Sequence, residues 1–235
     1  MKKILICNQK MYLTNDEATL LRNKMDVLDT SKLELIICPS YLNFDVFKGY
    51  ELGAQNAFYE DKGAYTGEIS AYDLSLRKIK YVLVGHSERR VYDDDKIVGL
   101  KLKAILRNSM TPVLCVGETK LDRELRRTSE VIKKQLETAL SGVILDGSQK
   151  LYIAYEPRYL IGGKKTLNQD EIIDTINYIK KIIDYMGIKN YRLLYGGAIT
   201  PDNIKNIVCD DIDGYLLGNS CVLFDELKEI INCIK

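Results

Sequence analysis

The chain has few of the residues that metal sites and disulfide frameworks require. It contains one histidine and six cysteines among 235 residues, and the cysteines are scattered without paired short spacings. Zinc sites use Cys and His clustered at short spacing, so no metal site is expected. Four cysteines lie in or beside apolar runs, where a small reduced thiol packs well. The six are Cys7, Cys38, Cys115, Cys209, Cys221 and Cys233.

The chain also lacks an excess of charge of either sign and any long hydrophobic run. Lys and Arg number 34 against 33 Asp and Glu, giving a net charge of +1. Such a chain has no overall attraction to nucleic acid or to an anionic membrane, so any anion must be recognised locally. The apolar residues 4–7 are too few for a signal peptide, and no run approaches the roughly 20 residues of a membrane span. We expect a cytoplasmic protein that binds neither nucleic acid nor membrane.

What is present is a repeating alternation of short β-rich runs and longer amphipathic segments, without a linker between them. With 46% hydrophobic residues, the chain can bury a large core, and we expect residues 1–235 to form a single domain. Apolar residues recur at helical spacing in 97–106, 131–140, 172–183 and 223–234, and Thr200 before Pro201 is typical of a helix start. Strands are predicted at 3–7, 34–38, 52–57, 81–85, 111–116, 151–155, 191–195 and 214–217.

Polar residues or glycines follow most of the predicted strands. In a closed (β/α)8 barrel the carboxyl ends of all strands meet on one face, where active sites lie. The alternation and these polar ends together predict an α/β fold of the TIM-barrel type, with eight parallel strands ringed by helices. The residues concerned are Asn8, Lys10, Gln55, Asn56, His86, Glu88, Glu118, Glu156, Gly196, Gly197, Gly218 and Asn219.

Two of these residues invite a chemical interpretation, although neither proves it alone. His86 is the only histidine and ends a strand-like run, yet a half-buried imidazole bonded to backbone explains the segment equally well. Glu156 follows an apolar strand and precedes Pro157, where a solvated loop carboxylate is the ordinary occupant. A carboxylate there becomes a stronger base if a loop closes over it and removes water.

Several separate segments match one family in order and approximate spacing. Residues 8–11 (NQKM), 84–90 (VGHSERR), 154–157 (AYEP) and 195–198 (YGGA) resemble the motifs of triosephosphate isomerase. Residues 54–57, 63–70, 114–118 and 213–218 extend the resemblance over almost the whole chain. The resemblance implies an aldose–ketose isomerase of glycolysis and gluconeogenesis that uses no cofactor. It also implies a small phosphorylated sugar as substrate, and a homodimer formed through the Gly63–Gly67 loop, with Thr66 near the neighbour's site.

The resemblance assigns a role to each candidate catalytic residue. Moving a proton between adjacent carbons requires a base, and the enediolate formed in between requires an electrophile. Glu156 corresponds to the base and His86 to the electrophile, which is a neutral imidazole in the well-studied enzymes of this family. Lys10 supplies a cation near the developing oxyanion, and Asn8 orients it by hydrogen bonding. Glu88 is a supporting carboxylate, with an ion pair to Lys10 or to the following arginines as the alternative.

Phosphate binding is expected at backbone amides of the last three loops. In barrels of this kind glycine lets N–H groups approach an anion closely after the late strands. The matching positions are Gly162, Ala198, Gly218 and Asn219. Asn219 stands where the family has a second glycine, and we expect it to be tolerated because Asn adopts left-handed backbone more readily than most residues.

The segment 157–166 resembles the family's lid, and here the chain departs from the pattern. Arg158-Tyr159 replaces the usual Val-Trp, and Ala198 replaces a serine whose hydroxyl bonds the closed lid. The loss of one such bond is worth about 0.5–1.5 kcal/mol, which predicts a leakier or slower lid. Tyr159 is expected to bond Glu118 in place of the tryptophan.

Three further features concern the surroundings of the site. Tyr195 retains a phenol that is expected to hold the lid near Leu167. Tyr12 replaces a small polar residue at a position that contributes to the subunit contact. The segment between the second and third strands is shorter than the family norm, so an abbreviated second helix is expected.

Three functions are compatible with the sequence. They are triosephosphate isomerase activity, isomerisation of a longer sugar phosphate such as a tetrulose phosphate, and a non-catalytic barrel that binds a metabolite or protein. The altered lid and Ala198 motivate the second. Loss of catalysis is expected to damage at least one catalytic position, yet Asn8, Lys10, His86 and Glu156 are all intact. The first function is therefore favoured.

Overall fold

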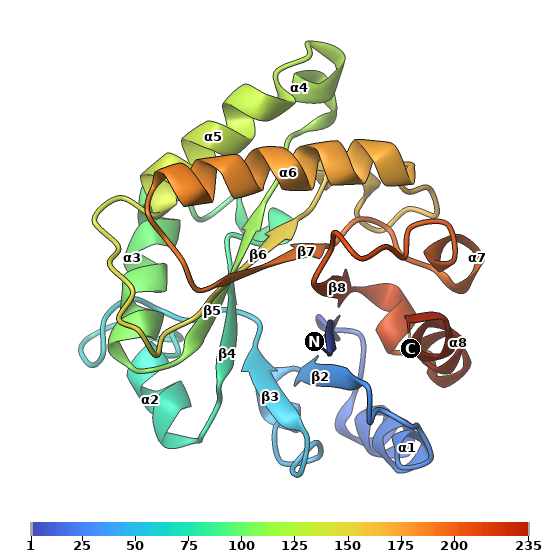
Figure 1. Ribbon diagram of the computed structural model, residues 1–235. Coiled ribbons are helices and arrows are strands. Elements are labelled where there is room, and N and C mark those ends of the chain that lie inside the picture. The colour runs from blue at the N-terminus through green and yellow to red at the C-terminus, as the bar shows by residue number, and fades with distance from the viewer. Residues whose placement is uncertain (1, 235) are drawn as a thin grey trace.

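The computed structural model describes residues 2–234 and contains a closed parallel barrel in which β1 to β8 are hydrogen-bonded in chain order. Figure 1 shows the strands at the centre and the helices around them. This is the (β/α)8 architecture that the sequence predicts. The strands are β1 Lys3–Asn8, β2 Leu33–Cys38, β3 Glu51–Ala54, β4 Tyr81–Val84, β5 Thr111–Val116, β6 Leu151–Tyr155, β7 Tyr191–Tyr195 and β8 Gly214–Leu217.

Helices follow most strands. They are α1 Asn15–Met25, α2 Ala71–Leu76, α3 Asp95–Arg107, α4 Lys120–Glu124, α5 Thr128–Ala139, α6 Gln169–Tyr185, α7 Pro201–Ile204 and α8 Phe224–Ile234. Short 3-10 helices lie at η1 Tyr41–Asn43, η2 Ser87–Arg89, η3 Arg158–Leu160 and η4 Asn219–Cys221. Between β2 and β3 the described chain has only η1, so the expected abbreviation of the second helix is confirmed. No helix within residues 2–234 has both the length and the apolar character needed to cross a membrane.

Predicted and observed element boundaries agree best in the second half of the barrel. The bounds of β5 to β8 are those predicted from the sequence. The third strand was predicted to reach residue 57 but ends at Ala54, because the side chain of Gln55 turns to the backbone carbonyls of Lys10 and Cys38. Thr200 and Pro201 do start a helix, as predicted, yet α7 is a single turn.

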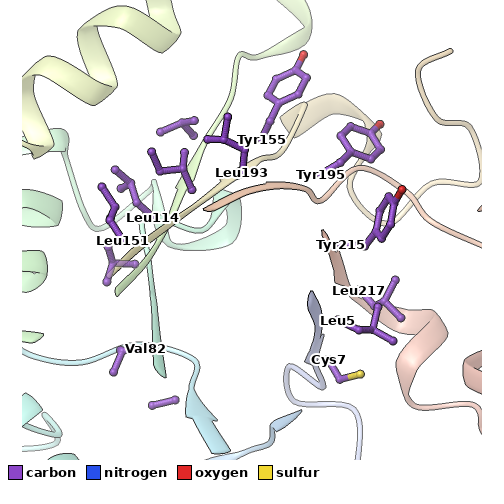
Figure 2. Packing of buried hydrophobic residues seen from close by; sticks show 14 of the residues in the cluster. Leu5, Cys7, Val82, Leu114, Leu151, Tyr155, Leu193, Tyr195, Tyr215 and Leu217 are labelled. Carbon is purple, nitrogen blue, oxygen red and sulfur yellow. The ribbon is translucent and has the colours of Figure 1, made fainter. Parts of the chain in front are cut away.

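The apolar core has two layers, separated by the strands themselves. Inward-facing residues such as Ile4, Ile6 and Ala154 fill the barrel, and residues between them, such as Leu5, face the helices. Figure 2 shows Tyr155, Tyr195 and Tyr215 from three neighbouring strands in this outer layer. Strands buried on both faces must be apolar throughout, which explains why they appear in the sequence as continuous hydrophobic runs.

The barrel closes where β1 pairs with β8, and glycine is required at this seam. Ile4 lies opposite Gly214 in the register. A Cβ atom at residue 214 would lie 2.1 Å from the carbonyl oxygen of Ile4, closer than packing allows. With the ring closed, Asn8, Glu156 and the glycines after β7 and β8 come to the same rim of the barrel.

Candidate active site

A cavity of about 190 Å³ opens at the carboxyl-terminal rim of the barrel. Each residue that the sequence proposed for catalysis or phosphate binding lines it, apart from the supporting Glu88, which lies beside it. These lining residues are Asn8, Lys10, His86, Glu156, Gly162, Ala198, Gly218 and Asn219. Segments more than 200 residues apart in the sequence therefore contribute to one hollow.

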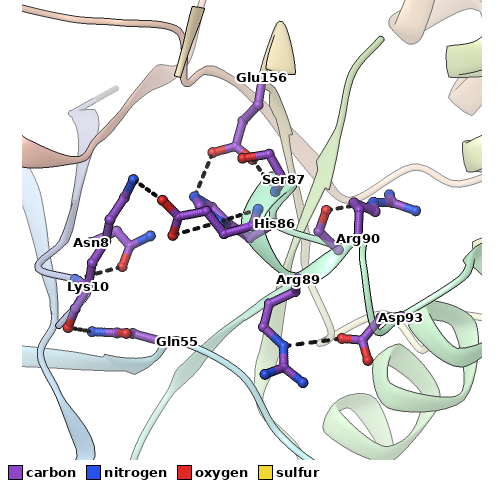
Figure 3. A network of polar contacts seen from close by, with 11 residues as sticks. Asn8, Lys10, Gln55, His86, Ser87, Arg89, Arg90, Asp93 and Glu156 are labelled. Carbon is purple, nitrogen blue, oxygen red and sulfur yellow. Dashed lines mark hydrogen bonds and ion pairs between the residues drawn. The ribbon is translucent and has the colours of Figure 1, made fainter. Parts of the chain in front are cut away.

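Glu156 and His86 face each other at the bottom of this cavity. Glu156 Oε1 lies 3.3 Å from His86 Nε2, and both side chains are buried. The other carboxylate oxygen accepts a 3.4 Å hydrogen bond from the backbone N–H of Ser87 (Figure 3). Glu156 continues the inward-facing series of Tyr152 and Ala154 in β6. Gly196 makes room for it, since a Cβ there would lie 3.0 Å from Glu156 Cγ.

A hydrogen bond to one ring nitrogen of His86 shows that the other nitrogen carries the proton. Its Nδ1 accepts a 3.3 Å bond from the backbone N–H of Glu88, because the chain turns into η2 immediately after His86. An imidazole that accepts at Nδ1 carries its proton on Nε2 and is neutral. The Nε2–H donor therefore points to Glu156 and the cavity, as an electrophile requires.

Lys10 reaches the cavity from a strained backbone that its neighbours support. Its φ is 50°, in the left-handed region that non-glycine residues rarely adopt. Asn8 Oδ1 accepts from the Lys10 N–H at 3.2 Å, and Gln55 Nε2 donates to the Lys10 carbonyl at 2.7 Å. Such strain persists where surrounding contacts over-determine it. The sequence places Gln55 at this rim but gives no signal of its supporting role.

Glu88 forms the ion pair that the sequence left open as an alternative. Lys10 Nζ donates to Glu88 Oε1 at 2.6 Å, and the Glu88 side chain is 56% exposed while that of Lys10 is 12% exposed. The charge of Lys10 is therefore shared with a carboxylate at the edge of the cavity. Figure 3 shows Lys10 extending toward the residues of the fourth loop.

Two polar residues act in support rather than in the cavity itself. Arg90 donates to the carbonyls of Gly85 at 2.7 Å and Cys115 at 2.9 Å, and so fastens the fourth loop to β5. Asn56 accepts at Oδ1 from Lys101 of α3, which the sequence did not anticipate. Both roles depend on partners distant in sequence, so no local pattern reveals them.

Cys115 lies beside the site, where its thiol has no evident chemical role. Its side chain is buried, and burial together with the nearby charge of Glu156 raises the pKa of the thiol well above its ordinary value. A thiolate is the reactive form of cysteine. Cys115 is therefore held as an unreactive thiol at neutral pH.

The expected phosphate loops converge on the cavity with one correction. Gly162 has a φ of 78° and uses the freedom that only glycine has there. Asn219 was expected to adopt left-handed backbone, which is wrong, because the residue begins the 3-10 helix η4 after Gly218. Asn is accommodated because that turn requires no positive φ, and the residue lines the cavity.

The lid has one predicted contact and lacks another. Tyr195 Oη lies 2.8 Å from Thr166 Oγ1 and accepts from the Leu167 N–H at 3.4 Å, so the predicted attachment of the lid is confirmed. The predicted bond from Tyr159 to Glu118 is not formed. Tyr155 on β6 donates to Glu118 Oε1 instead, at 3.1 Å, because its hydroxyl is buried next to that carboxylate.

Comparisons with known proteins find members of one family. The family model described as triosephosphate isomerase matches residues 3–234. A protein named triosephosphate isomerase from Clostridium perfringens is 36% identical over 97% of this chain and 98% of its own length. Proteins of the same name from Alkaliphilus metalliredigens and Caldanaerobacter subterraneus subsp. tengcongensis are each 37% identical, over 98% of this chain and 99% of theirs.

Proposed function

The chain belongs to the triosephosphate isomerase family, and on this basis we propose that it interconverts D-glyceraldehyde 3-phosphate and dihydroxyacetone phosphate. One observation carries the proposal beyond family membership. A buried carboxylate, Glu156, lies 3.3 Å from a ring nitrogen of the only histidine, in a cavity that glycine-rich loops also line. A base and a donor that meet at one small cavity are the groups that proton transfer between adjacent carbons needs.

We propose that substrate binding exchanges the partners of His86. In the structure, Nε2 of His86 faces Glu156 Oε1. A carbonyl oxygen of the substrate entering between them accepts the Nε2–H donor and releases the carboxylate. Glu156 then removes a proton from one carbon and returns it to the next, while His86 donates to the oxygen on which charge develops.

Lys10 and Asn8 complete this set in the proposed reaction. The ammonium of Lys10 lies at the cavity wall and offsets negative charge on the enediolate and the phosphate. Asn8 holds the backbone that presents it, through the bond from the Lys10 N–H. Glu88 positions the ammonium through the 2.6 Å ion pair. These roles follow from the contacts and from the family.

For the substrate phosphate we propose the backbone amides of Gly162, Ala198, Gly218 and Asn219. All four residues line the same cavity, from the sixth, seventh and eighth loops. Backbone N–H groups that point into one cavity bind an anion without requiring a charged side chain. Closure of the lid over the bound molecule excludes water and protects the enediolate from losing its phosphate.

We further propose a single-domain protein that acts in the cytoplasm as a homodimer. Apolar side chains are exposed on the loops after β1, β2 and β3, including Met11 at 93%, Leu42 at 88% and Tyr65 at 44%. Exposed apolar groups on adjacent loops are typical of an interface. Tyr65 precedes Thr66 in the Gly63–Gly67 loop. Light scattering that gives a mass of 26.8 kDa rather than twice that value contradicts the dimer.

The proposed activity is tested by steady-state isomerisation of glyceraldehyde 3-phosphate, beside tetrulose phosphates, with Glu156→Gln as the control. Loss of the base is expected to lower kcat by about 10²–10⁴-fold, while the affinity for inorganic phosphate is kept. Glu156→Asp, which retracts the carboxylate by one methylene, is expected to lower kcat in the same direction. Turnover confined to tetrulose phosphates supports the longer substrate, which the altered lid and Ala198 motivate. Absence of turnover with either supports a non-catalytic barrel.

A further inference from the structure

Lys164 is a cation of the cavity to which neither the catalytic set nor the phosphate amides give a role. Two cations and two carboxylates line the cavity, and they are Lys10, Lys164, Glu156 and Glu226. Lys10 is already paired with Glu88, which lies outside it. Without Lys164 the lining charges sum to −1, which opposes the entry of a phosphate dianion. Lys164 brings the charge of the lining to zero and so removes this repulsion.

The backbone of Lys164 is tied to the loop that carries Ala198. Nδ2 of Asn203 donates to the Ala198 carbonyl at 2.8 Å and lies 3.5 Å from the Lys164 carbonyl. Asn203 is itself fixed, because its Oδ1 accepts from the Thr200 N–H at 3.0 Å. This amide holds the carboxyl-terminal part of the lid next to the seventh loop. The backbone of Lys164 therefore lies at the end of the cavity where the phosphate amides are proposed, two residues after Gly162.

The ammonium group of Lys164 is available to a ligand. Within residues 2–234 it forms neither an ion pair nor a hydrogen bond to another side chain, and the residue is exposed. A lysine ammonium is a compact charge on a flexible four-carbon stem, which can turn toward an arriving anion. A hydrogen bond from an ammonium group to a phosphate is charge-assisted, hence stronger than a bond from a neutral hydroxyl.

We infer that Lys164 binds the phosphate dianion of the substrate as the lid closes. This inference rests on the proposed function for the identity of the ligand, and it names a positioning residue rather than one that takes part in proton transfer. Ala198 has no hydroxyl group that can hydrogen-bond the lid. Lys164 instead attracts the lid to the closed site through its contact with the bound phosphate. Closure is thereby coupled to the presence of a phosphate.

The test compares Lys164→Gln with the conservative Lys164→Arg and with Lys205→Gln. Lys205 is exposed at the end of α7 and does not line the cavity, so its replacement matches the change in net charge. We expect Lys164→Gln to raise both KM for glyceraldehyde 3-phosphate and Kd for inorganic phosphate by about tenfold, with kcat changed less than about threefold. Arginine is expected to restore most of both affinities, and Lys205→Gln to change neither.

Salt dependence gives a second readout that a purely structural role does not alter. The wild-type KM is expected to rise with ionic strength more steeply than that of Lys164→Gln, because one charge contact has been removed. KM and phosphate Kd within about twofold of wild type in Lys164→Gln overturn the inference. Because phosphate binding is measured without turnover, a wild-type protein that binds phosphate through Lys164 but isomerises no triose phosphate overturns the proposed function alone.

Discussion

At the scale of single residues, one phenolic oxygen connects the seventh strand to the lid. Tyr195 Oη contacts both Thr166 and Leu167 while its ring is buried in the core. In Tyr195→Phe the ring stays packed and the contacts of the hydroxyl are lost. Since one hydrogen bond is worth about 0.5–1.5 kcal/mol, we expect kcat/KM to fall roughly two- to tenfold with the thermal midpoint nearly kept. An unchanged kcat/KM shows that the lid does not depend on this hydroxyl.

A second residue prediction concerns the thiol beside the carboxylate. Burial and the charge of Glu156 raise the pKa of Cys115, whereas Cys209 and Cys233 are partly exposed. Native protein treated with iodoacetamide at pH 8 is therefore expected to be alkylated at Cys209 and Cys233 well before Cys115, as mapped by mass spectrometry. Early labelling of Cys115 contradicts this order. Protein unfolded in urea is the control, in which all three react.

The residues proposed for catalysis were easier to place at the cavity from the sequence than the residues that support them. Asn8, His86 and Glu156 stand at the ends of strands, where a side chain has one face of the barrel to reach. Gln55 and Arg90 donate to backbone carbonyls of other segments of the chain, and those contacts exist only after the barrel has closed. The bond predicted from Tyr159 was wrong for the same reason, since the packing that brings Tyr155 to Glu118 exists only in the folded barrel.

At the scale of elements, α5 holds the end of β5 through one buried amide. Gln135 accepts at Oε1 from the Gly117 N–H at 2.8 Å and donates at Nε2 to the Gly117 carbonyl at 3.1 Å. Gly117 packs against the backbone of Glu156, since a Cβ there would lie 1.9 Å from the Glu156 carbonyl oxygen. This contact links a helix on the outside of the barrel to the position of the proposed base.

Replacing Gln135 by Leu therefore affects both folding and activity. The substitution keeps a similar volume but leaves two buried backbone groups of Gly117 without partners. We expect the free energy of unfolding, measured with urea, to fall by about 1–3 kcal/mol. We also expect a loss in kcat, because the loop next to Glu156 loosens. A free energy of unfolding in Gln135→Leu equal to that of the wild type contradicts this role of the amide.

The strands were predicted more accurately than the turns and short helices. Most strand residues are apolar because they are buried on both faces of the sheet, and that signal is local. The end of β3 and the single turn of α7 depend on contacts with other segments of the chain, such as that between Gln55 and the end of β2 at Cys38. The sequence therefore predicts the number and order of strands, and it leaves the lengths of the connections to tertiary packing.

At the scale of the whole molecule, the tyrosines of the core make stability sensitive to alkali. Burial raises the pKa of Tyr195 to about 12, and it raises the pKa of Tyr155, Tyr152 and Tyr215 as well. An unfolded chain releases phenolic protons near pH 10, before the folded protein does. Stability from these groups is therefore complete below about pH 10 and is lost as pH rises toward 12.

Urea unfolding at several pH values measures this effect. The midpoint is expected to stay level between pH 8 and 9.5 and then to fall steeply between pH 10 and 12. Tyr215→Phe removes one buried phenol that otherwise donates to the Ile207 carbonyl, and it is expected to reduce the steepness of the fall. A midpoint that stays level up to pH 12 shows that the phenols ionise equally in both states.

Because β1 pairs with β8, the ring closes late when the chain is made on a ribosome. Translation proceeds from the amino terminus, so β1 emerges before the seven other strands and keeps one unpaired edge until residues 214–217 follow. Asn8 and Lys10 belong to this early segment, yet their final neighbours include Gly218. A nascent chain therefore gains its active site only after residues 214–219 have emerged, and a chain interrupted before residue 214 exposes a strand edge that chaperones or aggregation can capture.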